Sequence, residues 1–126
     1  MQRILLVDDD ESFRKMLRKT LIRMGYDVLE ARNGDEALKA YELELVDLML
    51  TDLVMPEREG LETISAFKRK HSGAKIIAMS GGGRVSAKDY LNVAKMLGAN
   101  RVLSKPFSNE EMEAAIKDVL GKADSV

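Results

Sequence analysis

The most constraining feature of the sequence is the segment 46–52, VDLMLTD, which is apolar or β-branched at five of its seven positions. A nearly continuous apolar run of this length predicts a β-strand buried on both faces, as in the middle of a parallel sheet. Turn-forming residues follow directly in the segment 55–60, MPEREG. Asp52 is therefore expected at the carboxyl end of a central strand, and that edge of an open α/β sheet is where ligands bind.

Short apolar segments alternate with segments of helical periodicity along the rest of the chain. The predicted strands are 4–7, 27–31, 46–52, 74–80 and 100–104. Predicted helices follow each strand, at about 11–24, 34–41, 60–70, 86–97 and 108–120. Strict alternation with short connections predicts a doubly wound α/β domain, with helices on both faces of a parallel sheet. The mixed polarity of the second strand places it nearer an edge.

Length, charge and composition exclude several other classes of protein. The 126 residues suggest one domain, expected at 1–121, with a frayed tail at 122–126. A net charge of −1 gives no basic field for nucleic acid, and no apolar run approaches the roughly 20 residues of a membrane helix. A cytoplasmic protein without direct contact to nucleic acid or membrane is expected. The absence of cysteine and the single histidine exclude thiolate zinc and multi-histidine metal sites.

Polar residues stand where four of the predicted strands end. Asp8 and Asp9 follow the first strand, Asp52 ends the third, Ser80 ends the fourth and Lys105 follows the fifth. Because parallel strands end at the same edge of a sheet, these side chains are expected to converge. Three clustered carboxylates repel one another unless a cation lies among them, and a hard divalent cation such as Mg²⁺ suits oxygen ligands.

The same set of side chains suits phosphoryl transfer. Lys105 supplies a point charge for a phosphoryl oxygen, and Ser80 supplies a hydroxyl donor. Asp52 is then the predicted nucleophile, which accepts a phosphoryl group and becomes an aspartyl phosphate. Mg²⁺ and Lys105 would stabilise the charge on the transferring group.

The segments that contain these residues resemble the receiver domain of two-component response regulators. The matching segments are ILLVDDDE, DLMLTDLVMPEREG, IIAMSGGG and GANRVLSKPF, which occur in that order between about residues 2 and 120. The resemblance implies a flavodoxin-like (βα)5 fold with a five-stranded parallel sheet of order 2-1-3-4-5. It also implies a signalling domain that catalyses only its own phosphorylation and dephosphorylation.

The resemblance implies a role for each residue of the metal site. Asp52 would be the phosphoacceptor and a metal ligand. Asp9 would bind Mg²⁺ directly, and Asp8 would act mainly through water. The backbone carbonyl of Val54, two residues after the phosphoacceptor, would be a further ligand.

The resemblance also implies phosphoryl contacts and partners. Ser80 and Lys105 would contact the phosphoryl group, and the Lys105-Pro106 bond would be cis. The donor would be a sensor histidine kinase or a phosphotransfer protein. A downstream protein target would bind the face formed by helix 86–97, strand 100–104 and helix 108–120.

Two positions depart from the family pattern. Val102 stands where the family usually has a switch aromatic, so we expect the readout to pass through the loop after Ser80, which contains the glycines 81–83. Val54 and Gly82 occupy positions that tune loss of phosphate. Neither carries a polar side chain to position a water, so slow loss is expected.

Other functions on a similar fold fit the sequence less well. A Mg²⁺-dependent phosphatase usually needs a second aspartate two residues after the nucleophile, where this chain has Val54. A flavin or nucleotide domain needs a glycine- or hydroxyl-rich loop after the first strand, where this chain has the acidic residues 8–10. A phosphorylation-independent docking module is the alternative that stays open.

Several other residues have structural explanations. Asp10 and Glu11 are expected to cap a helix, Asp47 to lie at the start of its strand, and His71 to be a solvated residue at a helix C-terminus. The methionines are expected to pack in the core. The wide apolar arc of helix 86–97 fits a deeply packed helix and a partner surface equally well.

Overall fold

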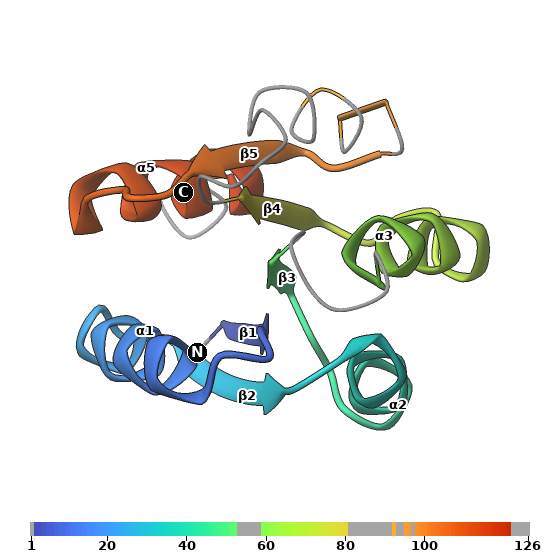
Figure 1. The fold of residues 1–126 in the computed structure, drawn as a ribbon, viewed down its shortest axis with the longest axis horizontal. Helices are drawn as coiled ribbons and strands as arrows, with labels where there is room; N and C mark the ends of the chain where they lie inside the picture. The colour runs from blue at the N-terminus through green and yellow to red at the C-terminus, as the bar shows by residue number, and fades with distance from the viewer. Residues whose placement is uncertain (1, 53–58, 81–91, 93–94, 97, 122–126) are drawn as a thin grey trace.

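The structure, a computed structural model, describes residues 2–52, 59–80, 92, 95, 96 and 98–121, without the side chains of residues 59–61. These residues contain one parallel sheet whose strand order is β2-β1-β3-β4-β5 (Figure 1). The strands are β1 (Arg3–Val7), β2 (Asp27–Ala31), β3 (Leu48–Asp52), β4 (Ile76–Ser80) and β5 (Arg101–Ser104). The predicted flavodoxin-like fold and strand order are confirmed.

The apolar strands occupy the centre of the sheet, as their composition predicts. Every residue of β3 and β4 is buried, whereas the more polar β2 and β5 lie at the two edges. In the parallel register, Val7 pairs with Thr51, and Ser80 pairs with Ser104. The carboxyl ends of β1, β3, β4 and β5 therefore lie at one edge of the sheet.

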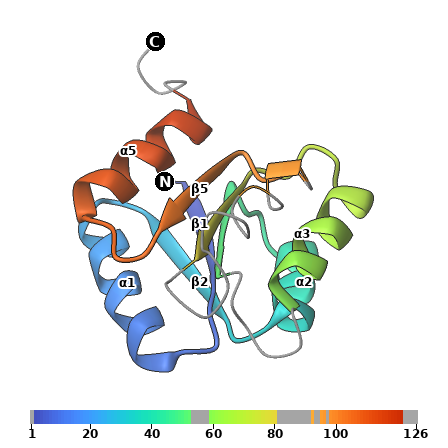
Figure 2. The same ribbon diagram turned by 45° about the horizontal axis from the view of Figure 1, so that its top comes forward.

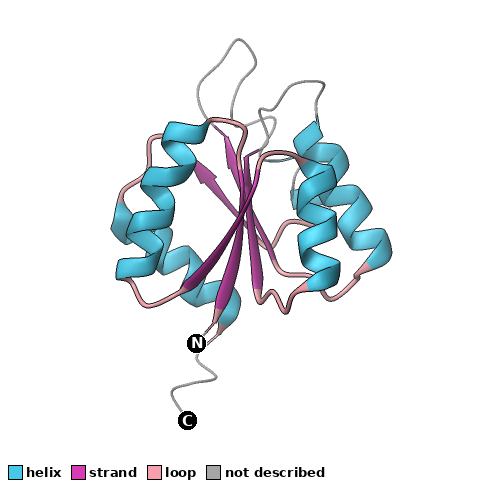
Figure 3. Ribbon diagram, turned by 90° about the horizontal axis from the view of Figure 1, so that it is seen from below, coloured by secondary structure: helices cyan, strands magenta, loops and turns pink. Residues whose placement is uncertain are grey.

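Within the described part of the chain, four helices cover the sheet, two on each face. They are α1 (Glu11–Arg23), α2 (Gly34–Leu43), α3 (Glu59–Lys70) and α5 (Asn109–Leu120). Figure 2 shows α1 and α5 together on one side and α2 and α3 on the other, and Figure 3 shows the sheet between these two layers. Side chains cap three of the helix N-termini by accepting a backbone N–H three residues further on; they are Asp10, Asn33 and Ser108.

The core has two halves, because residues of a strand alternate between the two faces of the sheet. One half lies under α1 and α5 and contains Leu17, Leu21, Met112 and Ile116. The other lies under α2 and α3 and contains Ala37, Ile64 and Phe67. These helical residues, which recur at helical spacing, therefore face the sheet.

The structure differs from two expectations about single residues: the burial of the methionines and the solvation of His71. Met16 and Met96 are exposed by 55% and 86%, so these two methionines are not core residues. Met16 instead lies beside a groove between α1 and the connection from β5 to α5. His71 directly follows the end of α3, as expected, but its side chain is only 31% exposed, its ring lies 4.7 Å from that of Tyr41, and its Nε2 atom is buried. The packing of α2 against α3 covers part of this ring.

Parts of the sequence expectations fall outside the described residues. They are Val54, the glycines 81–83, most of helix 86–97 and the tail 122–126. Residue boundaries elsewhere differ slightly, since β3 and β4 begin at Leu48 and Ile76 and not at 46 and 74. None of the described helices has the length and apolar character needed to cross a membrane.

Candidate phosphoacceptor site

The strand ends bring three carboxylates and one ammonium together. Oxygen atoms of Asp8, Asp9 and Asp52 lie within 4.8 Å of one another. The Nζ atom of Lys105 lies 3.4 Å from Oδ2 of Asp8 and 3.6 Å from Oδ2 of Asp52. The parallel register produces this cluster, because residues from β1, β3 and the end of β5 reach the same edge of the sheet.

Asp8 is fully buried at the end of β1. Its Oδ1 atom accepts the backbone N–H of Asp10 at 2.9 Å, and its Oδ2 atom faces Lys105. Burial raises the pKa of the Asp8 carboxyl above its ordinary value, and the Asp10 amide and the Lys105 ammonium offset only part of this effect. The buried Asp8 carboxylate is therefore a charged group that a further cation would stabilise.

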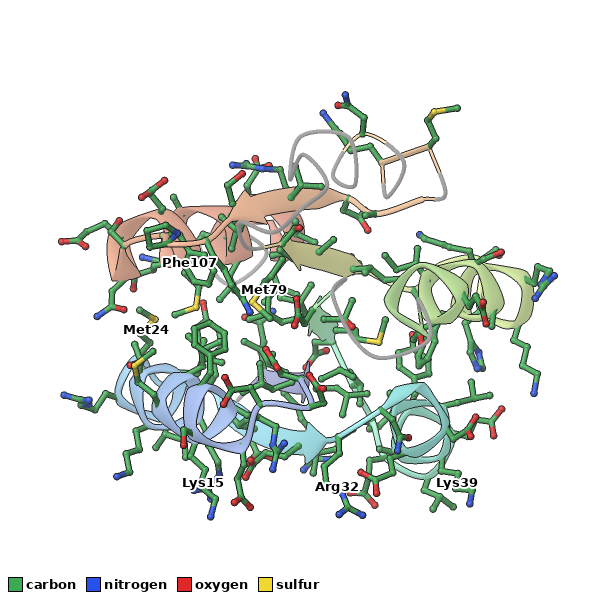
Figure 4. The ribbon with its side chains drawn as sticks, viewed as in Figure 1. Lys15, Met24, Arg32, Lys39, Met79 and Phe107 are labelled. Atoms are coloured by element: carbon green, nitrogen blue, oxygen red, sulfur yellow. The ribbon has the colours of Figure 1, made fainter. Side chains whose placement is uncertain are left out.

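Asp52 and Asp9 differ in exposure. Asp52 is 5% exposed at the end of β3, where it pairs with Met79 of β4. Met79 is labelled in Figure 4. Asp9 follows the buried Asp8 and is exposed. The cluster therefore combines two buried carboxylates with one that faces solvent.

Ser80 ends β4 next to this cluster. Its backbone carbonyl accepts the N–H of Lys105 at 2.7 Å, which ties the ends of β4 and β5 together. Its Oγ atom is buried and has no hydrogen-bond partner among the described residues. A buried hydroxyl without a partner is costly, so a ligand oxygen at this position would stabilise it.

Lys105 is held by the chain that follows β5. The Lys105-Pro106 peptide bond is cis, as the family resemblance implied. The Lys105 side chain is 22% exposed, and its ammonium also lies 4.0 Å from the centre of the Phe13 ring. The Phe13 ring is a contact that the sequence analysis did not anticipate.

Arg14 is a second residue that the sequence analysis missed. It is 5% exposed, and it donates from Nη1 to the carbonyl oxygen of Asp8 at 2.7 Å and from Nε to Glu30 at 2.8 Å. It thereby fixes the backbone of the strand end that carries the acidic residues. Its spacing from Leu17 and Leu21 places it on the buried face of α1, and this spacing could have predicted from the sequence that Arg14 is buried.

The donor set fits a divalent cation. Asp8, Asp9 and Asp52 offer only carboxylate oxygens, which are the ligands that Mg²⁺ prefers. Burial raises the pKa of the Asp8 carboxyl despite the nearby Lys105 ammonium, so the charged form of Asp8 would gain from a further cation. The three carboxylates are therefore the residues that would hold Mg²⁺.

Replacing Asp8 by asparagine is expected to stabilise the domain at pH 7 when divalent cations are removed. The amide can still accept the N–H of Asp10, while the buried negative charge disappears. We expect a gain of about 1 kcal/mol in the free energy of unfolding, because the asparagine removes a buried charge that the Asp10 amide and the Lys105 ammonium compensate only in part. Urea unfolding followed by circular dichroism in EDTA measures this gain.

The pH dependence of unfolding tests the same prediction, that Asp8→Asn is more stable than the wild type. Because folding raises the pKa of Asp8, the folded state holds its proton more tightly, and the charged carboxylate destabilises the fold above that pKa. The advantage of the asparagine variant should therefore shrink as the pH falls through the raised pKa towards the ordinary value of an aspartate. A variant that is less stable than the wild type at pH 7 in EDTA would contradict this prediction.

Comparison with known proteins agrees with the fold and the acidic cluster. A family model described as the response regulator receiver domain matches residues 4–117. The probable transcriptional regulator ycf27 of Pyropia yezoensis is 37% identical over 99% of this chain and 50% of its own length. Transcriptional regulatory protein CpxR of Escherichia coli (strain K12) is 32% identical over 98% of this chain and 51% of its own length.

Solved structures show the same architecture. A response regulator receiver domain protein from Clostridium thermocellum superposes with a TM-score of 0.88 over 99% of this chain and 98% of its own, at 24% identity, a likeness that concerns the fold. Response regulator protein TrrA from Thermotoga maritima, in complex with Mg²⁺-BeF, superposes with a TM-score of 0.82 at 31% identity. That match covers 94% of this chain and 99% of the other.

The chain therefore belongs to the response regulator receiver domain family. This is a signalling domain of two-component systems, and its acidic cluster at the sheet edge is consistent with Mg²⁺ binding. The chain spans about half the length of the curated relatives that it matches.

Proposed function

We propose that this domain accepts a phosphoryl group on Asp52 in a Mg²⁺-dependent reaction and thereby changes its affinity for a partner. The observation that carries the proposal is the convergence of three carboxylates with the Lys105 ammonium, next to the buried hydroxyl of Ser80, which has no hydrogen-bond partner among the described residues. A carboxylate cluster that only bound a cation would require neither the Lys105 ammonium nor the Ser80 hydroxyl. The proposed receiver domain comprises residues 1–121. We propose that the protein is cytoplasmic.

Each described residue has one part in the proposed reaction. A carboxylate oxygen of Asp52 attacks the phosphorus of the donor, and the bond from phosphorus to the leaving group breaks. The Lys105 ammonium leaves its contact with the carboxylates to offset charge on a phosphoryl oxygen, and the Ser80 hydroxyl donates to another. Bound Mg²⁺, held by the three carboxylates and the carbonyl of Val54, would neutralise the remaining negative charge.

The proposed partners follow from the family. The donor would be a sensor histidine kinase or a phosphotransfer protein, and a downstream protein would bind the face formed by 86–97, 100–104 and 108–120. The complex of the relative TrrA with Mg²⁺-BeF supports the metal-dependent part of the proposal. Val102 is half-buried in the core and has no ring to reorient, so the proposed readout depends on the loop after Ser80.

The proposal is tested by intact mass after incubation with acetyl phosphate. We expect the mass to increase by one phosphoryl group with Mg²⁺ present and to stay unchanged in EDTA. Hydroxylamine should remove the added group, because it cleaves acyl phosphates and spares phosphoesters. If the wild type gains no group with Mg²⁺, the proposal fails and the phosphorylation-independent docking module becomes the better account of this chain.

A further inference from the structure

The Lys105 side chain needs a further contact that keeps its ammonium in the site. Lysine has a flexible four-carbon stem and a compact, strongly hydrated charge, so several side-chain conformations compete. Here the side chain is 22% exposed, which leaves a path to solvent. Its two ion-pair distances, 3.4 and 3.6 Å, are longer than a strong charge-assisted hydrogen bond. The carboxylates alone therefore hold the ammonium loosely.

The ring of Phe13 supplies a further contact for this ammonium. Nζ of Lys105 lies 4.0 Å from the ring centre, well inside the range of a cation–π interaction. Such an interaction uses the negative electrostatic face of the ring and needs no carboxylate. The ammonium can therefore contact the ring and the acidic cluster at the same time.

Phe13 is itself fixed from two directions. Its backbone N–H donates to Oδ1 of Asp10 at 3.1 Å, and the N–H of Asp10 donates to Asp8 at 2.9 Å. Its ring packs edge-to-face against Phe107, with ring centres 6.4 Å apart and an interplanar angle of 79°. Figure 4 shows Phe107 on the connection between β5 and α5. The ring position is therefore tied both to the acidic strand end and to the segment that carries Lys105.

The Phe13 ring lies at the border between the core and a groove. It packs against the core cluster that contains Leu17 and Leu21, and it lines a groove of about 420 Å³ between α1 and the start of α5, where it is half-buried. The ring therefore contacts the core and is also within reach of the Lys105 ammonium.

We propose that Phe13 is a positioning residue that holds the Lys105 ammonium at the phosphoacceptor site through a cation–π contact. This inference rests on the proposed function, because it gives the ring a part in phosphoryl transfer to Asp52. The ring restricts the lysine to conformations that point into the site, so less conformational freedom is lost when the phosphoryl group arrives.

The decisive experiment changes the electrostatics of the ring and leaves its shape almost unchanged. Phenylalanine analogues with one, two or three ring fluorines are placed at position 13, and the rate of phosphorylation by acetyl phosphate with Mg²⁺ is measured. Each fluorine weakens the negative face of the ring, so the rate should fall stepwise. Phe13→Leu should be about 3- to 10-fold slower than the wild type, and Phe13→Tyr should restore most of the rate.

Met16→Leu is the control, because Met16 lines the same groove on α1 and has no aromatic ring. Its phosphorylation rate should stay close to that of the wild type. A slowdown equal to that of Phe13→Leu would show that packing in the groove matters and would overturn the inference. In the wild type, the ε-methylene protons of Lys105 should also show an upfield ring-current shift by NMR, which Phe13→Leu abolishes.

The outcomes separate this inference from the proposed function. Normal phosphorylation of the wild type with no effect of ring fluorination overturns the positioning role alone. If the wild type takes no phosphoryl group under any condition, the proposed function fails and the positioning role fails with it. Phosphorylation that falls with each added fluorine supports both.

Discussion

Replacing Asp52 by asparagine should abolish phosphorylation by acetyl phosphate, with a loss of at least about 1,000-fold in rate. An amide has no negative oxygen to attack phosphorus, and the side chain is otherwise nearly the same size. The variant also removes one of three mutually repelling carboxylates, so the fold should be retained. Intact mass measures the adduct, and circular dichroism confirms that the variant is folded.

Asp47→Asn is the matched control for this prediction. Asp47 lies just before β3, at the opposite end of the strand from Asp52, where its Oδ2 atom accepts the backbone N–H of Arg3 at 2.7 Å. The same chemical change there should leave the yield of phosphorylated protein unchanged. An adduct that persists in Asp52→Asn would remove Asp52 from its central role, and loss of the adduct in both variants would point to unfolding.

Replacing Lys105 by methionine should separate cation binding from phosphoryl transfer. Methionine keeps an unbranched apolar stem beside Phe13 but removes the charge that would meet the phosphoryl oxygen. We expect phosphorylation to be slower by about 100-fold, the usual cost of one lost transition-state donor. Mg²⁺ affinity should stay the same or increase, because the ammonium and the cation compete for Asp8 and Asp52.

Isothermal titration with Mg²⁺ and the phosphorylation rate together decide this prediction. Lys117→Met is the control, because this exposed lysine on α5 pairs with Glu113 on the same helix, away from the strand ends. It should change neither quantity. A Lys105→Met variant that loses Mg²⁺ binding together with phosphorylation would show that the lysine supports the structure of the acidic cluster and does not act on the phosphoryl group.

Most of the fold was predictable because its signals are local. The apolar runs of β3 and β4 specify buried central strands, and the mixed polarity of β2 specifies an edge. Parallel strands have their carboxyl ends at the same edge of the sheet, so the sequence alone predicts that Asp52 and Lys105 lie close together. The caps at Asp10 and Ser108 were likewise readable from residue type and spacing.

The contacts around the site were less predictable. Periodicity shows which face of a helix is buried, but it does not show what that face touches. Arg14 lies on the buried face of α1 and binds the carbonyl of Asp8, although an arginine is ordinarily assigned to the surface. Met16 has the spacing of a core residue and is exposed beside the groove, because the neighbouring chain leaves that part of α1 uncovered.

Residue patterns along the chain were enough to predict a doubly wound parallel sheet with three carboxylates, a serine and a lysine at the ends of its strands. The folded structure was needed to place the Lys105 ammonium close to both Asp8, which is 97 residues away, and the ring of Phe13. Strand and helix patterns arise from neighbours within a few residues, so they can be recognised in the sequence. The position of a flexible side chain depends instead on charges and rings that the fold brings from distant parts of the chain.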